Sequence, residues 1–400
     1  MSEPRPDSVR SSREPSAATA AEQRWPWWPL LPLYPYGRRR TLVRQLIPGR
    51  LWTFDQVQGV WYVAVPIRMT VVRLGGGLLL YAPVAPTAEV LAALRDLESR
   101  HGPVRTIVLP TTSGLEHKLP TPAMARAFPQ ADLWVSPHQW SFPVPLPLSW
   151  LGFPAARTRV LFDEGLPHAD ELDWCPLGPL DLGLGTFMEV ACFHRASGSL
   201  LLADALVAIP SEPPEVFDLD PTPLLFHGRE RADEGLADSP ERRRRGWRRL
   251  VLFANFLRPD SLDIAFGDGL RGMLPPGCRG PRCHFGFYPF RWRQGWEVEA
   301  EGLLSPLGEE VRVAPVLERL VFPRFRAELV AWVRRLAELG DVRWIVPAHY
   351  HAPVATSPDR LRALADVLEA RPWAPSGGSW AALAGIDRRL QEWGVVPRQV

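Results

Sequence analysis

The feature that most constrains the fold is the stretch of residues 104–118, which reads V-R-T-I-V-L-P-T-T-S-G-L-E-H-K. A short apolar run ends at Pro110, and the polar loop that follows closes on an acid beside a histidine, Glu116 and His117. An apolar run of this length, bounded by Pro and Gly, is typical of a buried strand. Loops at the ends of such strands carry the chemistry of many α/β proteins, so His117 is either a metal ligand or an ordinary loop histidine.

The sequence around this stretch predicts alternating strands and helices. Three β-rich runs, at residues 59–65, 69–74 and 78–82, predict an antiparallel meander. Residues 87–101 have apolar side chains at helical spacing behind an N-cap, Thr87. A strand, a short helix and another strand follow. The order β-β-β-α-β-α-β predicts an α/β layer sandwich.

The length of the chain limits the number of domains, and its net charge limits the kinds of partner. With 400 residues, the chain exceeds what one hydrophobic core usually serves, so two domains or one large domain with insertions is expected. A net charge of +2 gives no electrostatic case for a nucleic-acid partner. Four cysteines are too few for a disulfide scaffold of this length, which indicates a reducing compartment. No motif indicates a nucleotide cofactor.

The two ends of the chain differ from its middle. Residues 1–24 are polar and poor in aromatic side chains, which predicts a disordered arm. Residues 25–50 form a second arm, and its part from Trp25 to Arg40 is rich in Trp, Pro, Tyr and Arg. This composition suits an interface, either with the protein's own globular domain, which we favour, or with a membrane surface as a peripheral contact. Residues 372–400 predict a Pro/Gly-rich tail with one short helix.

The middle, residues 51–371, reads as one domain with a Pro- and aromatic-rich insertion at about residues 210–310. The insertion carries three metal-competent side chains close together in sequence: Cys278, Cys283 and His284. A zinc site would need further ligands at a matching spacing, so a structural loop is the preferred interpretation.

Metal-competent side chains follow three predicted strands. They are Glu116 with His117, then Asp204, then His349 with His351. Oxygen and imidazole ligands that converge from several strand ends are the pattern of a catalytic zinc, iron or manganese site. Each position alone is weak evidence, since an acid after a strand is often a helix cap and a loop histidine is often a surface residue.

Several longer motifs resemble a known family. The segments F-H-R-A-S-G-S-L-L-L-A-D-A-L-V, L-L-F-H-G-R-E, R-R-G-W-R-R-L-V-L-F and I-V-P-A-H-Y-H are similar to the domain-of-unknown-function 4336 family of cyanobacteria and plants. The element order and the T-x-x-x-x-[acid]-H motif resemble the metallo-β-lactamase fold. Over about residues 51–368, the resemblance implies an αββα sandwich, a cyanobacterial setting and a location in the cytoplasm, either free or at a membrane surface.

The resemblance also implies a reduced metal site. The superfamily signature T-H-x-H-x-D-H corresponds to residues 111–117, where Thr112 and Gly114 replace the first two histidines, Glu116 replaces the aspartate, and His117 is kept. The third-motif histidine, expected near residues 185–188, is absent. These losses remove the ligands of the first metal.

The resemblance assigns the ligands of the second metal to Glu116, His117, Asp204 and His349. It therefore implies one divalent ion (Zn, Fe or Mn), with Glu116 and Asp204 as catalytic groups acting on an unknown small molecule. Pocket-lining roles are expected for three residues: Thr112, Tyr350 and His351.

Two further departures count against catalysis. L-L-Y-A-P at residues 79–83 replaces the family's L-I-D-T-G, which removes an orienting Asp, and Glu116 is one methylene longer than Asp. A non-catalytic binding or assembly module on the same fold is therefore the alternative.

Overall fold

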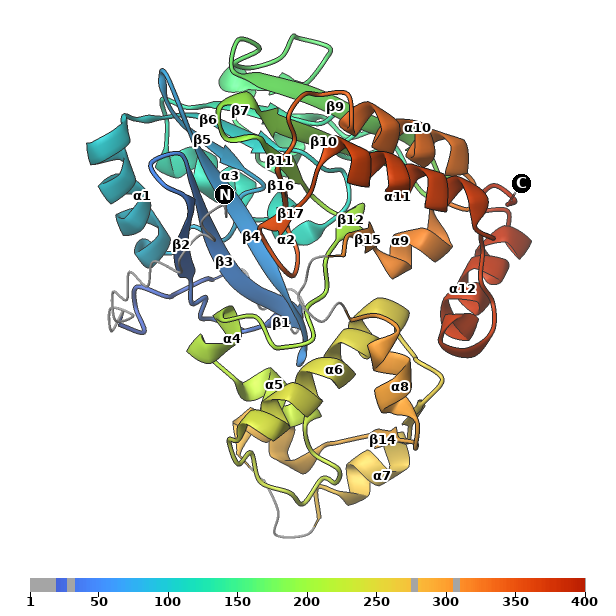
Figure 1. Cartoon of the computed structure of the whole chain (residues 1–400). Coiled ribbons are helices and arrows are strands. Elements are labelled where there is room, and N and C mark those ends of the chain that lie inside the picture. The colour runs from blue at the N-terminus through green and yellow to red at the C-terminus, as the bar shows by residue number, and fades with distance from the viewer. Residues whose placement is uncertain (1–18, 27–32, 275–279, 305–309, 400) are drawn as a thin grey trace, which may run out of the picture.

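The computed structural model describes residues 19–26, 33–274, 280–304 and 310–399 (Figure 1). Residues 1–18 of the predicted disordered arm (residues 1–24) lie outside the described residues, and so does Cys278. In the described part, no helix is both long and apolar enough to cross a membrane.

The first sheet has eight strands in the order β1-β3-β4-β5-β6-β7-β8, with β2 paired to β3. Pairing is antiparallel from β1 to β5 and parallel from β5 to β8. The strands are β1 (Leu33–Tyr34), β2 (Leu42–Ile47), β3 (Leu51–Val60), β4 (Val63–Leu74), β5 (Gly77–Tyr81), β6 (Val104–Leu109), β7 (Asp132–Val135) and β8 (Thr158–Val160).

The second sheet has five strands in the order β17-β16-β11-β10-β9. Its strands are β9 (Leu172–Asp181), β10 (Thr186–His194), β11 (Ser199–Leu202), β16 (Trp344–Pro347) and β17 (Val354–Ala355). The central pair β11 and β16 is parallel, with Leu202 opposite Pro347. The loops that follow these two strands therefore begin side by side.

Three apolar layers hold the sheets and helices together. Leu79, Val108, Val190 and Leu201 belong to the core between the sheets. Helices α1 (Ala88–His101) and α3 (Thr121–Ala127) cover the outer face of the first sheet. Helices α10 (Arg326–Leu336) and α11 (Pro358–Ala370) cover that of the second. Figure 1 shows these helices on opposite sides of the two sheets, so the predicted αββα sandwich is confirmed.

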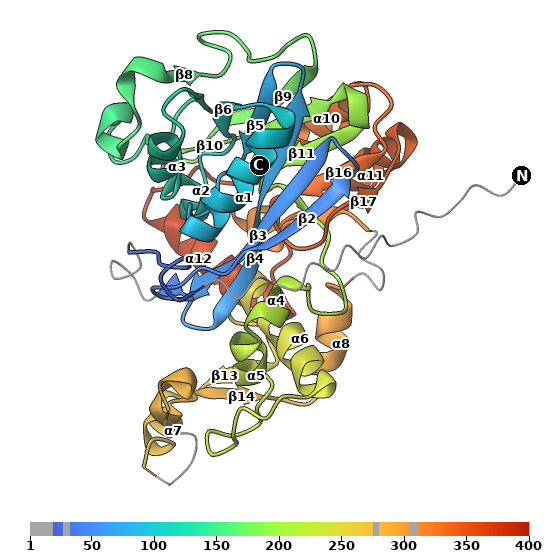
Figure 2. The ribbon, with the colours of Figure 1, turned by 90° about the vertical axis from the view of Figure 1, so that its left-hand side faces the viewer.

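The insertion leaves the sandwich after β12 (Leu206–Val207) and returns at β15 (Arg312–Val313), and these two short strands pair with each other. Figures 1 and 2 show its helices grouped beyond one end of the sheets. Its elements are α4 (Val216–Leu219), α5 (Thr222–His227), α6 (Pro240–Phe256), β13 (Leu262–Ile264), α7 (Phe266–Arg271), η5 (Pro281–Gly286), β14 (Phe290–Trp292) and α8 (Trp296–Glu301).

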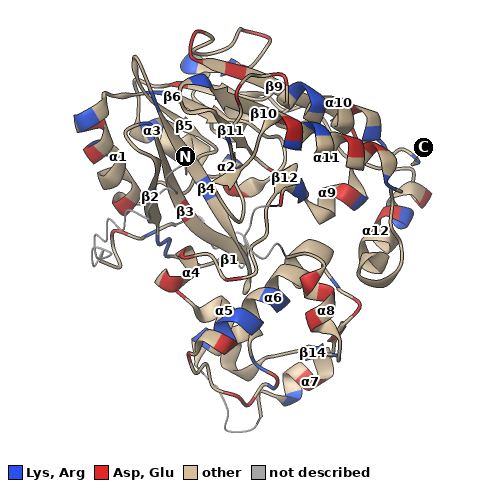
Figure 3. Cartoon of the chain, in the orientation of Figure 1, with Lys and Arg blue, Asp and Glu red and all other residues tan. Residues whose placement is uncertain are grey.

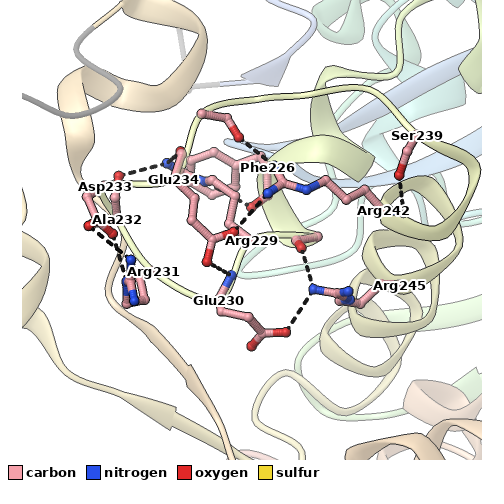
Figure 4. Close-up of polar contacts among 12 residues, drawn as sticks. Phe226, Arg229, Glu230, Arg231, Ala232, Asp233, Glu234, Ser239, Arg242 and Arg245 are labelled. Carbon is pink, nitrogen blue, oxygen red and sulfur yellow. Dashed lines mark hydrogen bonds and ion pairs between the residues drawn. The ribbon is translucent and has the colours of Figure 1, made fainter.

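Arginines organise the insertion. The basic run that opens α6 reads in the sequence as a solvated face, but in the structure each arginine meets an acid. The four pairs are Arg242–Glu234, Arg243–Asp238, Arg244–Glu212 and Arg245–Glu230. Figure 3 shows both signs of charge mixed over these helices. Deeper, the Arg229 guanidinium lies 4.5 Å from the ring centres of Phe226 and Tyr288, and it donates to the carbonyls of Ala232 and Glu234 (Figure 4).

A buried histidine makes the stability of the insertion depend on pH. Nε2 of His227 donates to the Tyr62 carbonyl at 2.9 Å. Burial, reinforced by Arg229 and Arg249 and opposed by that hydrogen bond, lowers the pKa of His227 to about 3. The unfolded chain then binds the extra proton from about pH 6.5 downward, whereas the folded chain does not until about pH 3. Stability is therefore retained above pH 6.5 and is lost as the pH falls below it.

We expect His227→Gln, whose amide can keep the bond to Tyr62, to reduce the dependence of the free energy of unfolding on pH. Urea unfolding at several pH values should show a variant curve that converges on or crosses that of the wild type between about pH 6.5 and 4, because each pH unit costs the wild type up to about 1.4 kcal/mol at this one group. The exposed His138 provides a control, since His138→Asn should leave the pH dependence unchanged. Parallel curves for wild type and His227→Gln would contradict the prediction.

The C-terminal helix α12 (Ala381–Glu392) is fixed to the sandwich through one buried acid. Asp387 is 1% exposed and pairs with Arg319 at 2.8 Å and Arg324 at 2.5 Å. Arg319 belongs to α9 (Pro315–Leu320), which returns the chain from the insertion. The predicted tail helix is thus part of the packed structure.

The aromatic arm packs against the protein where it is described. Trp25 and Tyr34 are both buried, and the Tyr34 hydroxyl donates to Asp220. Residues 27–32 of the arm lie outside the described residues, so a membrane contact stays a prediction. In the insertion, Cys283 is disulfide-bonded, which differs from the expectation of reduced cysteines and removes its thiolate as a metal ligand.

Candidate metal centre

The candidate site lies where strands of both sheets end. Strand β6 leads into α2 (Leu115–Lys118), which carries Glu116 and His117, while Asp204 follows β11 and His349 follows β16. The parallel pairing of β11 and β16 sets the last two side by side. The structure therefore brings together the four side chains that the sequence predicted to converge.

Asp204 is held from two directions. One oxygen, Oδ2, accepts from the Thr111 hydroxyl at 2.7 Å and the Ser113 hydroxyl at 2.5 Å. The other, Oδ1, lies 3.1 Å from Nε2 of His349. Burial alone would raise the pKa of Asp204, but the contacts with His349, Ser113 and Thr111 outweigh it and hold the pKa well below its usual value. Asp204 is therefore a fixed carboxylate.

His349 is clamped between carboxylates and a carbonyl. Its Nδ1 donates to the Pro66 carbonyl at 3.2 Å, and its Nε2 lies 3.1 Å from Asp204 and 3.4 Å from Glu116. Burial lowers the pKa of His349, but the two carboxylates overcome it and raise the pKa to about 10. Nε2 can hold a proton between the acids or ligate a metal, and the two states exclude each other.

His117 is the neutral histidine of the site. It is fully buried, and its Nδ1 donates to the Pro83 carbonyl at 3.1 Å. That bond leaves a lone pair on Nε2, a buried atom with no hydrogen-bond partner. Burial, more than any neighbouring charge, lowers the pKa of His117. The sequence comparison suggested that L-L-Y-A-P had lost its orienting group; this was wrong, because the Pro83 carbonyl orients the ring.

Glu116 fits because position 114 is glycine. Gly114 has φ of +70°, and a Cβ atom there would lie 2.6 Å from Oε1 of Glu116. The longer acid thus occupies space that any side chain at position 114 would take. Burial opposes ionisation, but the hydrogen bond and charge of His349 keep the pKa of Glu116 below its usual value.

Thr112 and Lys118 tie the loop together. The Thr112 hydroxyl donates to the Thr186 carbonyl and accepts from the Met188 amide, both at 2.8 Å, so it joins the loop to β10. The Lys118 ammonium donates to the carbonyls of Thr112 at 2.8 Å and Gln139 at 2.7 Å. Burial lowers the pKa of Lys118 to about 8, against the charges of Glu116 and Asp204. No role was predicted for Lys118 from its position in the sequence.

Glu189 is a second residue that the sequence analysis missed. It is fully buried in β10, and its carboxylate accepts the backbone N–H groups of Ala203, Asp204 and Ala205 at 2.8, 2.9 and 2.7 Å. Burial and the charge of Asp204 raise the pKa of Glu189 to about 7, against these three donors. The signal was present, because a lone acid inside the apolar run F-M-E-V-A-C-F must find buried partners.

We expect Glu189→Gln to destabilise the protein by about 1–3 kcal/mol, because the amide nitrogen cannot accept and leaves a buried N–H unpaired. Chemical denaturation measures the loss. Glu171→Gln is the control, since that acid accepts its backbone N–H bond at an exposed position. Equal stability of both variants would show that the carboxylate is not needed to anchor Asp204.

Arg68 fixes the loop that carries His349. It is fully buried on β4 and donates through Nη1 to the Pro347 carbonyl at 2.7 Å and through Nη2 to the Tyr350 carbonyl at 2.9 Å. Its Nε pairs with Asp55 at 2.6 Å. These two carbonyls flank His349 in sequence, so one guanidinium holds both sides of the loop.

Two of the three predicted pocket residues line a cavity. Tyr350 and His351 belong to the wall of a cavity of about 330 Å³, together with Asp55, Pro66 and Arg68. Thr112 does not line it, and neither do Glu116, His117, Asp204 and His349. The cavity and His349 both adjoin β4, since Pro66 lines the cavity and its carbonyl accepts from His349. His349 itself is not part of the cavity wall.

The donor set meets the requirements of a metal site. Glu116, His117 and His349 each offer one ligand atom, and these atoms lie within 4.8 Å of one another. Among the described residues this is the single group of three His, Cys, Asp or Glu with that spacing. Two imidazoles and one carboxylate serve catalytic zinc and non-haem iron, and they leave coordination positions open. With the unpartnered Nε2 of His117, the residues fit one divalent ion.

Comparison with known proteins now places the chain. A family model described as a domain of unknown function (DUF4336) matches residues 48–366. The chain belongs to this family. The match spans β3 to β8 of the first sheet, all of the second sheet and the insertion of this DUF4336 protein. No protein of curated function matches the chain in sequence.

Solved structures with the same layer order include metallo-β-lactamases. The enzyme from Pontibacter korlensis is 11% identical, with a TM-score of 0.36 over 83% of this chain and 100% of its own. The mono-zinc form of FIM-1 from Pseudomonas aeruginosa is 10% identical, with a TM-score of 0.36 over 83% and 97%. The metal-soaked Flv1 flavodiiron core from Synechocystis is 10% identical, with a TM-score of 0.38 over 82% and 61%. These similarities concern architecture alone.

Proposed function

We propose that this DUF4336 protein binds one divalent metal ion through Glu116, His117 and His349 and is a mononuclear metal-dependent hydrolase. The observation that carries the proposal is the buried Nε2 of His117. It has no protein partner, and a ring nitrogen of His117 lies within 4.8 Å of a donor atom of each of the other two residues. A buried nitrogen lone pair without a partner costs free energy that a metal bond would repay.

The surrounding residues support catalysis as well as binding. A metal at this site would supply a Lewis acid that activates water and polarises a carbonyl or phosphoryl oxygen. Asp204 stays ionised, is held by Thr111 and Ser113, and is anchored through its backbone by Glu189. We assign it the role of general base, or of orienting His349.

A second function is favoured by one specific contact. Nε2 of His349 already lies between Asp204 and Glu116, and this ion cluster needs no metal to be complete. The same geometry therefore suits a non-catalytic module in which the cluster fastens the two sheets together.

Elemental analysis of the purified protein distinguishes the metal-dependent hydrolase from the non-catalytic module. The hydrolase proposal expects one zinc, iron or manganese ion per chain, lost in His117→Ala and in His349→Ala but kept in His138→Asn. A loss of metal in both variants with their folded circular dichroism spectra intact would support it. The hydrolase proposal would be refuted by well-folded wild-type protein that contains no metal, takes up none on titration, and unfolds identically with and without chelator. That result would favour the non-catalytic module.

A further inference from the structure

A hollow of about 610 Å³ lies where the N-terminal arm meets the insertion. Arg38 and Arg40 line it from the arm, Asp220 lines it just after α4, and Arg282 lines it from η5. It shares no residue with the candidate metal centre. Two distant parts of the sequence thus direct three guanidinium groups to one hollow.

The charge of this hollow is unbalanced. Its single acid, Asp220, accepts from the Tyr34 hydroxyl at 2.7 Å and the Thr222 hydroxyl at 2.5 Å, and it lies 3.6 Å from Arg282. Within the described chain, the Arg38 side chain makes neither a hydrogen bond nor an ion pair, whereas Arg40 donates only to a backbone carbonyl. Arg282 also donates to the Thr222 hydroxyl at 3.2 Å. Three cations therefore face one acid, and of the three the Arg38 side chain alone has no partner among the described residues.

The buried Arg39 side chain fixes the backbone that carries the lining arginines of the arm. Arg39, between the two lining arginines of the arm, is 2% exposed and donates to the carbonyls of Tyr34 and Val57 at 3.3 and 3.1 Å. These bonds attach the arm to β3 and fix the backbone on both sides. Lining arginines on a fixed backbone lose less entropy when they bind than arginines on a free arm.

We propose that this hollow binds a phosphate-bearing ligand. Guanidinium groups donate in pairs to phosphate oxygens, and a phosphate can accept from several such groups at once. The volume falls within the roughly 300–1,000 Å³ of small-molecule sites and exceeds the size of one phosphate ion. The ligand is therefore a phosphorylated small molecule or the phosphate of a lipid headgroup, which share this chemistry.

Calorimetry with sodium pyrophosphate, together with co-sedimentation on vesicles, tests the proposal and separates the two sources. The vesicles are phosphatidylcholine alone and phosphatidylcholine mixed with phosphatidylglycerol. The variants are Arg38→Gln and Arg282→Gln, and the control is Arg95→Gln, an exposed arginine of α1 with no described partner. All four proteins are compared in thermal unfolding, because these side chains are exposed and their replacement should leave the fold intact.

Saturable pyrophosphate binding that weakens roughly tenfold or more in both variants, with the control unchanged, supports a soluble phosphorylated ligand. Binding to phosphatidylglycerol vesicles alone, lost in the same two variants, supports a lipid headgroup. The proposal is overturned if neither probe binds, or if binding is equal in the two variants and the control. Arg38→Gln and Arg282→Gln leave the candidate metal centre intact, so a loss of binding in these variants is independent of the metal content of the protein.

Discussion

Replacing Arg68 by methionine is expected to destabilise the protein by about 3–5 kcal/mol and to weaken metal binding at His349. The large cost arises because Asp55, itself 2% exposed, would lose its buried cation and keep the partly exposed Arg44 and the Thr53 hydroxyl, and breaking a buried ion pair is strongly unfavourable. The carbonyls of Pro347 and Tyr350 would lose their donor in the same change. Urea unfolding and zinc titration measure the two effects.

Two further variants separate positioning from stability. Arg73→Met, the same change at an exposed position of the same strand, should alter stability by no more than about 0.5 kcal/mol. Arg68→Lys keeps a cation beside Asp55 but cannot reach both carbonyls, so it should recover more stability than metal affinity. Wild-type metal affinity in a folded Arg68→Lys protein would refute the positioning role.

Asp387→Ala is the second change with a large expected effect. It leaves two guanidinium groups, those of Arg319 and Arg324, buried without their acid, at a cost of about 3–5 kcal/mol. The amides of Gln391 and Gln399, at 2.7 and 2.6 Å from the same carboxylate, lose their acceptor as well. The midpoint of thermal unfolding should fall.

The matched change at an exposed acid is Asp359→Ala on α11, where stability should remain within about 0.5 kcal/mol of the wild type. Limited proteolysis adds a local measure, because the loss of Asp387 should expose cleavage sites in α12 first. Stability equal to that of Asp359→Ala would show that the C-terminal helix is dispensable for the fold.

Helices and short strands could be predicted from the sequence because their signals are local. Thr87 caps α1 through the Val90 amide, and α1 with this cap covers residues 87–101, whose apolar spacing predicts a helix. The meander was placed less well. The β-rich run at residues 59–65 contains the turn between β3 and β4, where Trp61 has φ of +53°, and no glycine or asparagine marks it. Hydrophobic periodicity cannot reveal a turn made of aromatic residues.

Prolines misled the prediction in two strands. Pro66 suggested a break, yet it lies within β4 opposite Val57, and its carbonyl receives the bond from His349. Strand β9 contains Pro176 and Pro179 and was not predicted. In both strands, long-range pairing outweighs the local preference of proline against sheets.

Convergence of Glu116, His117, Asp204 and His349 was predictable because each follows a strand. Their supports were not, because Arg68 and Glu189 act through backbone groups that no side-chain motif records. The accommodation of Glu116 over Gly114 likewise depends on a local backbone geometry. Sequence comparison identified the residues that changed, whereas the structure shows which neighbours changed with them.

The pairing of β12 with β15 has an evolutionary consequence. Since the insertion departs and returns through two antiparallel strands in contact, its length is decoupled from the register of either sheet. Closing a longer loop costs only logarithmically more entropy, so relatives can lengthen, shorten or exchange this segment without disturbing the strand ends that carry the histidines. The insertion is thus the part of the chain whose length can change while the loops that carry Glu116, His117, Asp204 and His349 keep their places.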